Sequence, residues 1–261
     1  PSDGKSVFSY RDLADKSVNC HVDLCIHLAS LNSNLAEADI KKEVQLTENV
    51  LNSMKYMGCK KLIFFSTGKV YGDNAFSLKA FSESSESKPA CSYSKAKKLC
   101  EDLILKRSSA LALNSIIFRL PPVISKFNSS NLGKLMKLSQ RGFLIPLFAQ
   151  GNDNQRSFIS FSNIQTVTKH LINNQELFKN NKIYNLADEG YISLNDLLRI
   201  SSKRELWILP HLIANIFFKI PFLQGVLLKL YGNFVLENSK LTEEMGVKLS
   251  NTSDSLSIIY K

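Results

Sequence analysis

Four side chains whose types and spacing could transfer a proton lie in two short stretches of the sequence. Ser66 and Thr67 follow an apolar run, and Tyr93 and Lys97 stand four residues apart in a later segment. Residues with that spacing project from one face of a helix, so the phenol and the ammonium would lie together. A nearby ammonium favours the phenolate form of tyrosine, whose ordinary pKa is about 10. The four side chains predict an acid-base site at the end of a strand.

Strands and helices in alternation would have to position these side chains. An apolar strand is predicted at Lys61–Phe65, and it runs into a turn of small residues that carries the two hydroxyls. Apolar residues recur at helical spacing over Glu37–Met57, a helix that Gly58 would end. The helix of Tyr93 and Lys97 is predicted at Ser92–Arg107, with Leu99, Leu103 and Ile104 on its apolar side. Strand, helix and strand in succession indicate right-handed parallel crossovers.

The other predicted elements follow from the same kinds of pattern. Continuous apolar runs, typical of strands buried on both faces, occur at Val22–Ser30 and Ser115–Leu120. Inside the first of these, His27 is expected to be structural rather than catalytic or metal-binding. The remaining elements are a strand at Lys182–Ala187 and helices at Asn131–Arg141 and Ser193–Ser201.

Composition and charge narrow the class of protein. The 261 residues are 44% hydrophobic and 21% charged, as is ordinary for a soluble globular protein. The net charge of +10 suits an anionic partner, although a generally basic protein without one carries equal weight. Lys and Arg form no block of the kind that binds nucleic acid, so no nucleic-acid partner is expected.

The cysteines and the apolar segments bear on location. Five cysteines, an odd number without C-x-x-C spacing, predict free thiols in a reducing compartment and no metal site. No signal peptide opens the chain, and a cytoplasmic location is expected. The apolar segment Trp207–Phe234 is broken by Pro210 and Pro221, short of the roughly 20 residues that span a bilayer. Packing in a small C-terminal lobe is expected there, with weak association to a membrane surface as the alternative.

These segments, taken in order, resemble a known family. Ser66-Thr67 followed by Val70-Tyr71-Gly72, and then Tyr93 and Lys97, resemble the catalytic core of the extended short-chain dehydrogenase/reductase family. The resemblance is to UDP-glucose 4-epimerase-like enzymes, and the long apolar C-terminal segment is most similar to the surface-polysaccharide branch. Further segments that resemble the family are Val22–Ser30, Arg119–Val123, Gln155–Ile164 and Asn238–Gly246.

The resemblance implies a fold and a domain organisation. The fold would be α/β, a Rossmann-type doubly wound parallel sheet that lacks its first strands and its glycine-rich turn. The dinucleotide-binding domain would take residues 1–125, with 160–187 returning to it. A small C-terminal substrate-binding lobe would take residues 126–159 and 188–261.

The resemblance also implies roles for individual residues. Tyr93 would be the general acid/base, Lys97 would favour its phenolate, and Thr67 would hold the reacting oxygen of the substrate. The cofactor would be NAD or NADP, with NAD favoured. Cofactor-binding residues would be Leu28, Ala29, Ser30, Phe65, Ser66, Tyr93, Lys97, Pro121 and Val123, and substrate-binding residues Thr67, Asn131 and Arg156.

The chain departs from the family pattern at several positions. Glu43 stands where the family has an asparagine, and Asn163 stands where it has an acidic residue. Gly68 and Lys69 replace the acid pair that follows the threonine in dehydratases, so dehydration by that route is not expected. None of the 11 glycines forms the motif that receives the cofactor's pyrophosphate, and only 21 residues precede Val22. Since the chain begins with Pro1, it is expected to be an N-terminally truncated piece of an enzyme, with a degenerate relative as the alternative.

The predicted activity is that of a UDP-sugar 4-epimerase or 4-keto reductase in polysaccharide precursor synthesis. The alternative is a catalytically inactive relative that serves as a binding or scaffold protein. A homodimer is expected through the helices predicted at Glu37–Met57 and Ser92–Arg107, because family members commonly form a four-helix bundle there.

Overall fold

The structure is a computed structural model, and it describes residues 21–28, 30, 35–72, 79–124, 131–141, 147–148, 153–202, 208–220, 227 and 231–260. The chain divides into two compact units. The first comprises Pro1–Gly72, Glu86–Arg119 and Ile172–Tyr184. The second comprises Asp73–Ser85, Leu120–Leu171 and Asn185–Lys261. Of residues 160–187, which were predicted to return to the dinucleotide-binding domain, 172–184 fall in the first unit, and 160–171 and 185–187 fall in the second.

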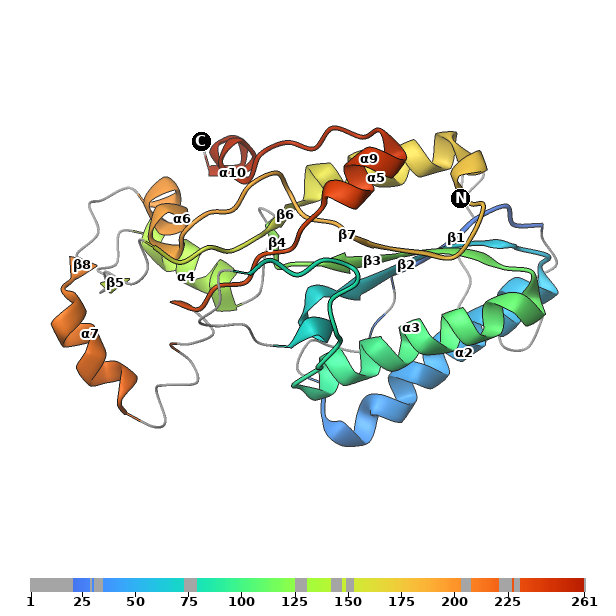
Figure 1. The fold of residues 1–261 in the computed structure, drawn as a ribbon, viewed down its shortest axis with the longest axis horizontal. Coiled ribbons are helices and arrows are strands. Elements are labelled where there is room, and N and C mark those ends of the chain that lie inside the picture. The colour runs from blue at the N-terminus through green and yellow to red at the C-terminus, as the bar shows by residue number, and fades with distance from the viewer. Residues whose placement is uncertain are drawn as a thin grey trace. The chain divides into compact units, whose positions relative to one another are not determined.

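A four-stranded sheet forms the centre of the first unit. Its strand order is β1-β2-β3-β7, and β1 runs parallel to β2 with Cys25 opposite Leu62 and His27 opposite Phe64 (Figure 1). This is the α/β arrangement that the sequence predicted. The strands are β1 at Cys25–His27, β2 at Lys61–Thr67, β3 at Asn114–Leu120 and β7 at Lys182–Asn185.

The strand β2 carries the hydroxyls of the site. Leu62, Ile63 and Phe64 are fully buried, which explains why the apolar run forms a strand covered on both faces. The prediction that Ser66 and Thr67 lie in a turn was wrong, because β2 continues through both residues. The turn that follows is the 3-10 helix η2 at Gly68–Tyr71.

The strand β1 is shorter than the predicted Val22–Ser30. It ends at His27, and the next residue, Leu28, has 69% of its surface exposed. Ala29 lies outside the described residues, as does the segment 1–20. An apolar run therefore identified this strand without fixing its ends.

Two helices lie side by side along one face of the sheet in the first unit (Figure 1). They are α2 at Ile40–Tyr56, which follows the 3-10 helix η1 at Glu37–Asp39, and α3 at Ser92–Leu111. Gly58 follows α2 with a φ of +67°, which confirms it as the residue that ends this helix.

The buried face of α3 differs in one respect from the prediction. Ala96, Cys100 and Ile104 recur at four-residue spacing, and all three are fully buried. Leu99 was predicted on the apolar side, but this was wrong because 48% of its surface is exposed. One residue rotates the helix by about 100°, which turns Leu99 away from the face defined by Cys100.

The second unit contains two short strand pairs and most of the remaining helices. β4 (Val123–Ile124) pairs with β6 (Ile159–Ser160), and β5 (Leu147–Phe148) pairs with β8 (Ile208–Leu209), both parallel. Ser193 caps α6 by accepting a hydrogen bond of 3.0 Å from the Asp196 backbone N–H, as the sequence predicted. The 3-10 helix η4 at Gln175–Leu177 belongs to the first unit. The helices of the second unit are α4 at Asn131–Gln140, α5 at Phe161–Asn173 (whose last two residues belong to the first unit), α6 at Leu194–Ser201, α7 at His211–Phe218, α9 at Ser239–Met245 and α10 at Thr252–Tyr260.

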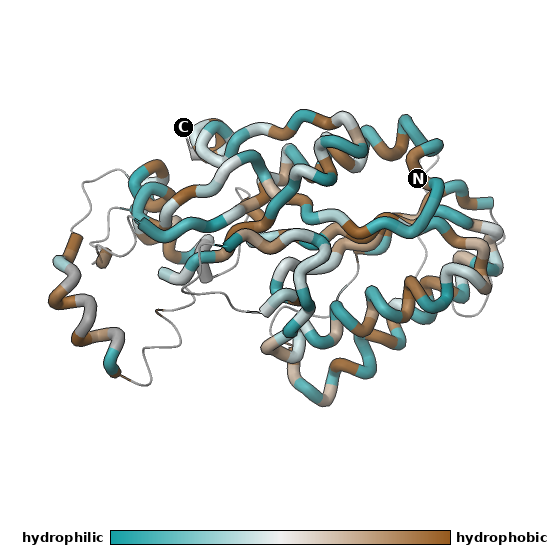
Figure 2. The backbone as a smooth tube through the Cα atoms, viewed as in Figure 1, coloured by the Kyte–Doolittle hydropathy of each residue, from teal (hydrophilic) through white to brown (hydrophobic). Residues whose placement is uncertain are grey.

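Apolar residues run along α7, within the segment predicted to pack in a C-terminal lobe (Figure 2). Leu212 and Ile216 have 80% and 66% of their surfaces exposed. In the described ranges, no helix has both the length and the apolar character needed to cross a membrane.

Candidate active site

Two elements of the first unit, β2 and α3, carry the side chains predicted to perform chemistry. Thr67 is the last residue of β2, and Tyr93 and Lys97 lie in the first two turns of α3. Open α/β sheets bind ligands at the carboxyl ends of their strands, which is where β2 presents Thr67. α3 packs against both β2 and η2, so Thr67 and the Tyr93–Lys97 pair lie on neighbouring elements.

Thr67 is oriented by the turn that follows it. Its Oγ1 accepts a hydrogen bond of 3.3 Å from the Lys69 backbone N–H and so caps η2. An accepting hydroxyl keeps its own hydrogen available for donation. Thr67 can therefore donate to a substrate oxygen without leaving this position.

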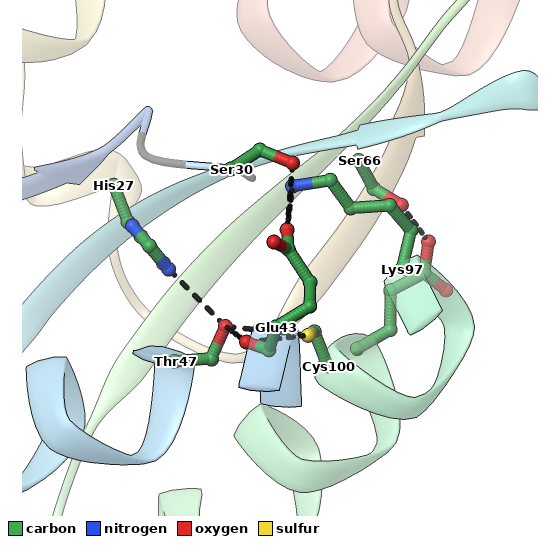
Figure 3. A network of polar contacts seen from close by, with 8 residues as sticks. His27, Ser30, Glu43, Thr47, Ser66, Lys97 and Cys100 are labelled. Atoms are coloured by element: carbon green, nitrogen blue, oxygen red, sulfur yellow. Dashed lines mark hydrogen bonds and ion pairs between the residues drawn. The ribbon is translucent and has the colours of Figure 1, made fainter. Parts of the chain in front are cut away.

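Lys97 is buried and faces a carboxylate of the neighbouring helix (Figure 3). Its Nζ lies 3.2 Å from Oε1 of Glu43, and the two side chains are only 3% and 1% exposed. The same Oε1 accepts a hydrogen bond of 2.7 Å from Ser30 Oγ. Glu43 therefore joins a residue predicted to bind the cofactor to a residue predicted to be catalytic.

The Lys97 ammonium also faces two aromatic rings. Its Nζ lies 4.9 Å from the ring centroid of Phe64 and 6.0 Å from that of Tyr93. Burial, and then the charges of Glu43 and Cys91, raise the pKa of Tyr93 to about 12. The phenol is therefore protonated at pH 7.

Within the described residues, no hydrogen bond to the Tyr93 hydroxyl is found. The phenol lies on the first turn of α3, with the Lys97 ammonium 6.0 Å from the centroid of its ring.

Ser66 belongs to a different set of contacts, although it is adjacent to Thr67. Its Oγ donates a hydrogen bond of 2.5 Å to Oε1 of Glu101. Arg119 binds the same carboxylate with two bonds, Nε to Oε1 at 3.1 Å and Nη2 to Oε2 at 2.7 Å. The Ser66 hydroxyl is thus held in the interior, which favours Thr67 as the hydroxyl that meets the substrate.

Glu101 and Arg119 were not predicted as partners from the sequence. Arg119 also places its Cζ 4.8 Å from the ring centroid of Tyr71. Burial lowers the pKa of Arg119, but the hydrogen bonds and charge of Glu101 outweigh burial and raise the pKa above its ordinary value. An arginine inside a run of apolar strand residues needs a buried partner, and that requirement was the signal that could have identified the pair.

His27 has the surroundings expected of a structural histidine. It is 4% exposed, and its Nε2 lies 3.2 Å from Thr47 Oγ1. Its ring lies 5.3 Å from that of Phe64, centroid to centroid. Burial, and then the charge of Lys97, lower the pKa of His27 to about 4, so the imidazole is neutral at pH 7.

The remaining predicted cofactor residues of the first unit differ in placement. Ser30 contacts Glu43, whereas Leu28 is largely exposed. The ring of Phe65 packs against that of Phe118, with 5.7 Å between centroids. Ala29 lies outside the described residues.

The other predicted site residues belong to the second unit. Arg156 donates from Nη1 to the Gly232 carbonyl at 2.7 Å. Asn163, which was predicted only as a departure from the family pattern, is buried and donates to Asp188 Oδ1 at 2.7 Å. Also in this unit are Pro121, Val123 in β4 and Asn131 at the start of α4, whose side chain lies outside the description.

The residues present fit one end of a dinucleotide cofactor. The Lys97 ammonium and the Thr67 hydroxyl can donate to a ribose or to a nicotinamide amide, whereas the Ser30 hydroxyl, whose hydrogen goes to Glu43, can only accept. The sequence has no glycine motif for the pyrophosphate end. Within the described ranges, no cluster of three His, Cys, Asp or Glu side chains could hold a metal ion.

Comparison with known proteins identifies one matching family model. Residues 8–187 match the model of the NAD dependent epimerase/dehydratase family. Among curated proteins, the chain is similar to UDP-arabinose 4-epimerase 1 of Arabidopsis thaliana, with 31% identity over 145 residues. That match covers 51% of this chain, and the chain spans about a third of the relative, 34% of its length.

Solved structures share the fold. UDP-N-acetylglucosamine 4-epimerase from Bacillus cereus superposes with a TM-score of 0.72 at 17% identity, covering 98% of this chain and 83% of that one. UDP-glucuronic acid 4-epimerase from Bacillus cereus in complex with NAD superposes with a TM-score of 0.72 at 17% identity, covering 95% and 74%. At these identities the likeness establishes the parallel-sheet α/β fold.

Proposed function

The chain belongs to the NAD dependent epimerase/dehydratase family, and from that premise we propose that it carries the acid-base site of a nicotinamide-dependent UDP-sugar 4-epimerase or 4-keto reductase. One observation supports this most strongly. Thr67, Tyr93 and Lys97 lie in one compact unit, with the Lys97 ammonium 6.0 Å from the Tyr93 ring centroid. The proposal of a UDP-sugar draws on the printed activities of the similar proteins.

The chain's own residues would position a sugar and move one proton. Thr67 would donate a hydrogen bond to the oxygen on the reacting carbon and hold it beside the Tyr93 hydroxyl. Tyr93 would give its proton to that oxygen when a ketone is reduced, or take the proton when an alcohol is oxidised. When bound, a nicotinamide cofactor supplies the hydride acceptor or donor.

The state of Tyr93 favours one direction of the proton transfer. Because its pKa is raised to about 12, the phenol is protonated and suited to donate toward a 4-keto sugar. Epimerisation needs both directions at the same carbon, so it would require the bound reactants to lower this pKa. Dehydration is not proposed, because Gly68 and Lys69 follow Thr67 in place of an acid pair.

Turnover by a Tyr93 variant tests the proposal. Tyr93→Phe removes only the hydroxyl, and we expect it to lower kcat by about 10² to 10⁴, the usual contribution of a general acid. Tyr191→Phe is the matched control, because Tyr191 lies in the second unit with 54% of its surface exposed. The measurement is epimerisation or reduction of UDP-sugars in the presence of NAD or NADP. Full activity in Tyr93→Phe would overturn the assignment.

A non-catalytic relative is the second candidate. Its basis is the pairing of Lys97 with Glu43, which offsets the charge of the ammonium near Tyr93. Fluorescence of bound reduced nicotinamide distinguishes the two candidates. Binding followed by turnover supports the enzyme, whereas UDP-sugar binding without cofactor binding supports the binding protein.

A further inference from the structure

Glu43 is a buried carboxylate to which the proposed reaction gives no role. It lies on the first turn of α2 and is 1% exposed. Its Oε1 contacts the Lys97 ammonium of α3 at 3.2 Å and accepts from Ser30 Oγ at 2.7 Å (Figure 3). A buried carboxylate is costly unless it is paired and hydrogen-bonded, and here both conditions are met.

The pairing changes the charge that Tyr93 experiences. A lone ammonium 6.0 Å from the ring centroid would favour the phenolate. A carboxylate in contact with that ammonium offsets most of its field at the distance of the phenol, because the two charges are opposite and close together. In a poorly solvated interior such fields are only weakly screened.

We propose that Glu43 is a positioning residue that holds Lys97 and Ser30 in place and, by offsetting the charge of Lys97, weakens the stabilisation that this ammonium gives to the Tyr93 phenolate. The carboxylate acts through Lys97 and not by touching substrate. This inference rests on the proposed function for its catalytic meaning, but its effect on the phenol is a property of the protein alone.

The other groups around Tyr93 are accounted for on each neighbouring element. The charge of Cys91, at the N-cap of the same helix, also raises the pKa of Tyr93. Burial raises the pKa of the Cys91 thiol, but hydrogen bonds with Ser94, and then the charge of Lys69 of η2, outweigh burial and lower it. From β1, His27 stays neutral because its own pKa is lowered to about 4. Only Glu43 among these groups both contacts Lys97 and bears a charge opposite to it.

The test is the titration of Tyr93 in the cofactor-free protein. Tyrosines labelled at a ring carbon are followed by NMR against pH, and Tyr93→Phe assigns the resonance. In Glu43→Gln a negative charge is removed near the phenol, which favours the phenolate, so the midpoint should fall by about one pH unit or more. An unchanged midpoint would overturn the proposal.

Glu48→Gln is the matched control for this titration. Glu48 lies on the same helix and pairs with Arg107 of α3 at 3.2 Å. Arg107 follows Lys97 by ten residues, about 15 Å along the helix. Loss of this ion pair should leave the Tyr93 midpoint where it is in the parent protein. An equal shift in Glu48→Gln would show that the loss of any ion pair between α2 and α3 lowers the Tyr93 midpoint. That result would contradict a specific role for Glu43.

A second pair of variants covers the case in which Glu43→Gln does not fold because Lys97 is left without its partner. Lys97→Gln is compared with the double variant Lys97→Gln/Glu43→Gln, which leaves no buried ammonium unpaired. A carboxylic acid has an ordinary pKa of about 4.3, far below the pH at which a phenol titrates. The double variant should therefore titrate Tyr93 at lower pH than Lys97→Gln. Equal midpoints would refute the inference.

Activity measured in parallel separates this inference from the proposed function. A shifted titration without UDP-sugar turnover supports the role of Glu43 and counts against the enzyme. Turnover by the parent protein, combined with an unchanged Tyr93 midpoint in Glu43→Gln, supports the enzyme and counts against the role of Glu43.

Discussion

At the scale of residues, buried charges in the first unit occur in pairs that hold the site from two sides. Lys97 pairs with Glu43, and Arg119 pairs with Glu101, whose carboxylate also receives Ser66. The first pair acts on the acid-base residue, and the second fixes the strand end from which Thr67 projects. Both pairs lie in the interior, so removal of one partner should be costly.

Glu101→Gln should destabilise the protein by about 3 to 5 kcal/mol, because it leaves the Arg119 guanidinium buried without a counter-charge. Asp102→Asn is the neighbouring control. Asp102 pairs with Lys98, and its side chain is 54% exposed, so the loss should be under about 1 kcal/mol. Urea unfolding measures both values. Equal losses would show that the buried pair contributes no more to stability than the exposed one.

His27 predicts a dependence of stability on pH. Its pKa is about 4 in the folded protein, compared with 6.5 for an unperturbed histidine. Between these values the unfolded chain binds a proton that the folded protein does not, so stability falls as pH decreases from 6.5 to 4. The loss amounts to about 3 kcal/mol, at about 1.4 kcal/mol for each pH unit.

The variant His27→Gln should remove this contribution. Urea unfolding at pH 7 and at pH 4.5 should show a smaller loss of stability in the variant than in the parent protein. The same decrease in both proteins would mean that other groups account for the acid sensitivity.

At the scale of elements, two glycines with positive φ predict different costs of substitution. Gly246 (φ +66°) has open space where a Cβ would be placed, whereas a Cβ on Gly72 (φ +90°) would lie 2.6 Å from the Lys88 carbonyl oxygen. Gly246→Ala should cost about 1 to 2 kcal/mol from the left-handed backbone alone. Gly72→Ala should cost more, because the backbone of Lys88 must also move. Thermal unfolding of the two variants tests this order.

The elements were largely predictable where local sequence determines them. The periodicity of α2, the glycine after it and the cap of α6 were all apparent from the sequence. The ends of β1 and β2 were not, because a strand ends where its neighbour stops pairing, and His27 is the last residue of β1 with a partner on β2. Leu99 was assigned to the wrong face of α3, because the apolar character of one leucine does not show which of two adjacent rows of helix residues faces the core.

The candidate site was predictable only in part, because some of its contacts depend on how separate elements pack together. Tyr93 and Lys97 were found because their spacing on one helix is a local property. The contact of Glu43 with Lys97 depends on how α2 packs against α3, and the contact of Glu101 with Arg119 depends on how α3 packs against β3. The sequence near each of these residues shows only a charged residue among apolar ones, and it does not identify the partner.

At the scale of the whole molecule, we expect a homodimer through α2 and α3. Leu99 on α3 and Tyr56 on α2 each have 48% of their surface exposed, which suits a second copy of the chain. Leu99→Asp should therefore shift the protein to monomers in light scattering. Ile172→Asp is the control, since Ile172 is 44% exposed on α5 and should leave the dimer intact. A monomeric parent protein, or a dimeric Leu99→Asp, would contradict this expectation.

We propose that Tyr93, supported by Lys97 and Thr67, transfers the proton that accompanies hydride transfer to or from a nicotinamide. The most direct measurement is the formation of the 4-epimer or of the reduced sugar, followed by NMR of the sugar after the protein is mixed with cofactor and a UDP-sugar or 4-keto sugar. The parent protein and Tyr191→Phe should form product with time, and Tyr93→Phe should form it about 10² to 10⁴ times more slowly. Equal product formation by Tyr93→Phe, or none by the parent protein with any UDP-sugar or 4-keto sugar tested, would contradict this role of Tyr93.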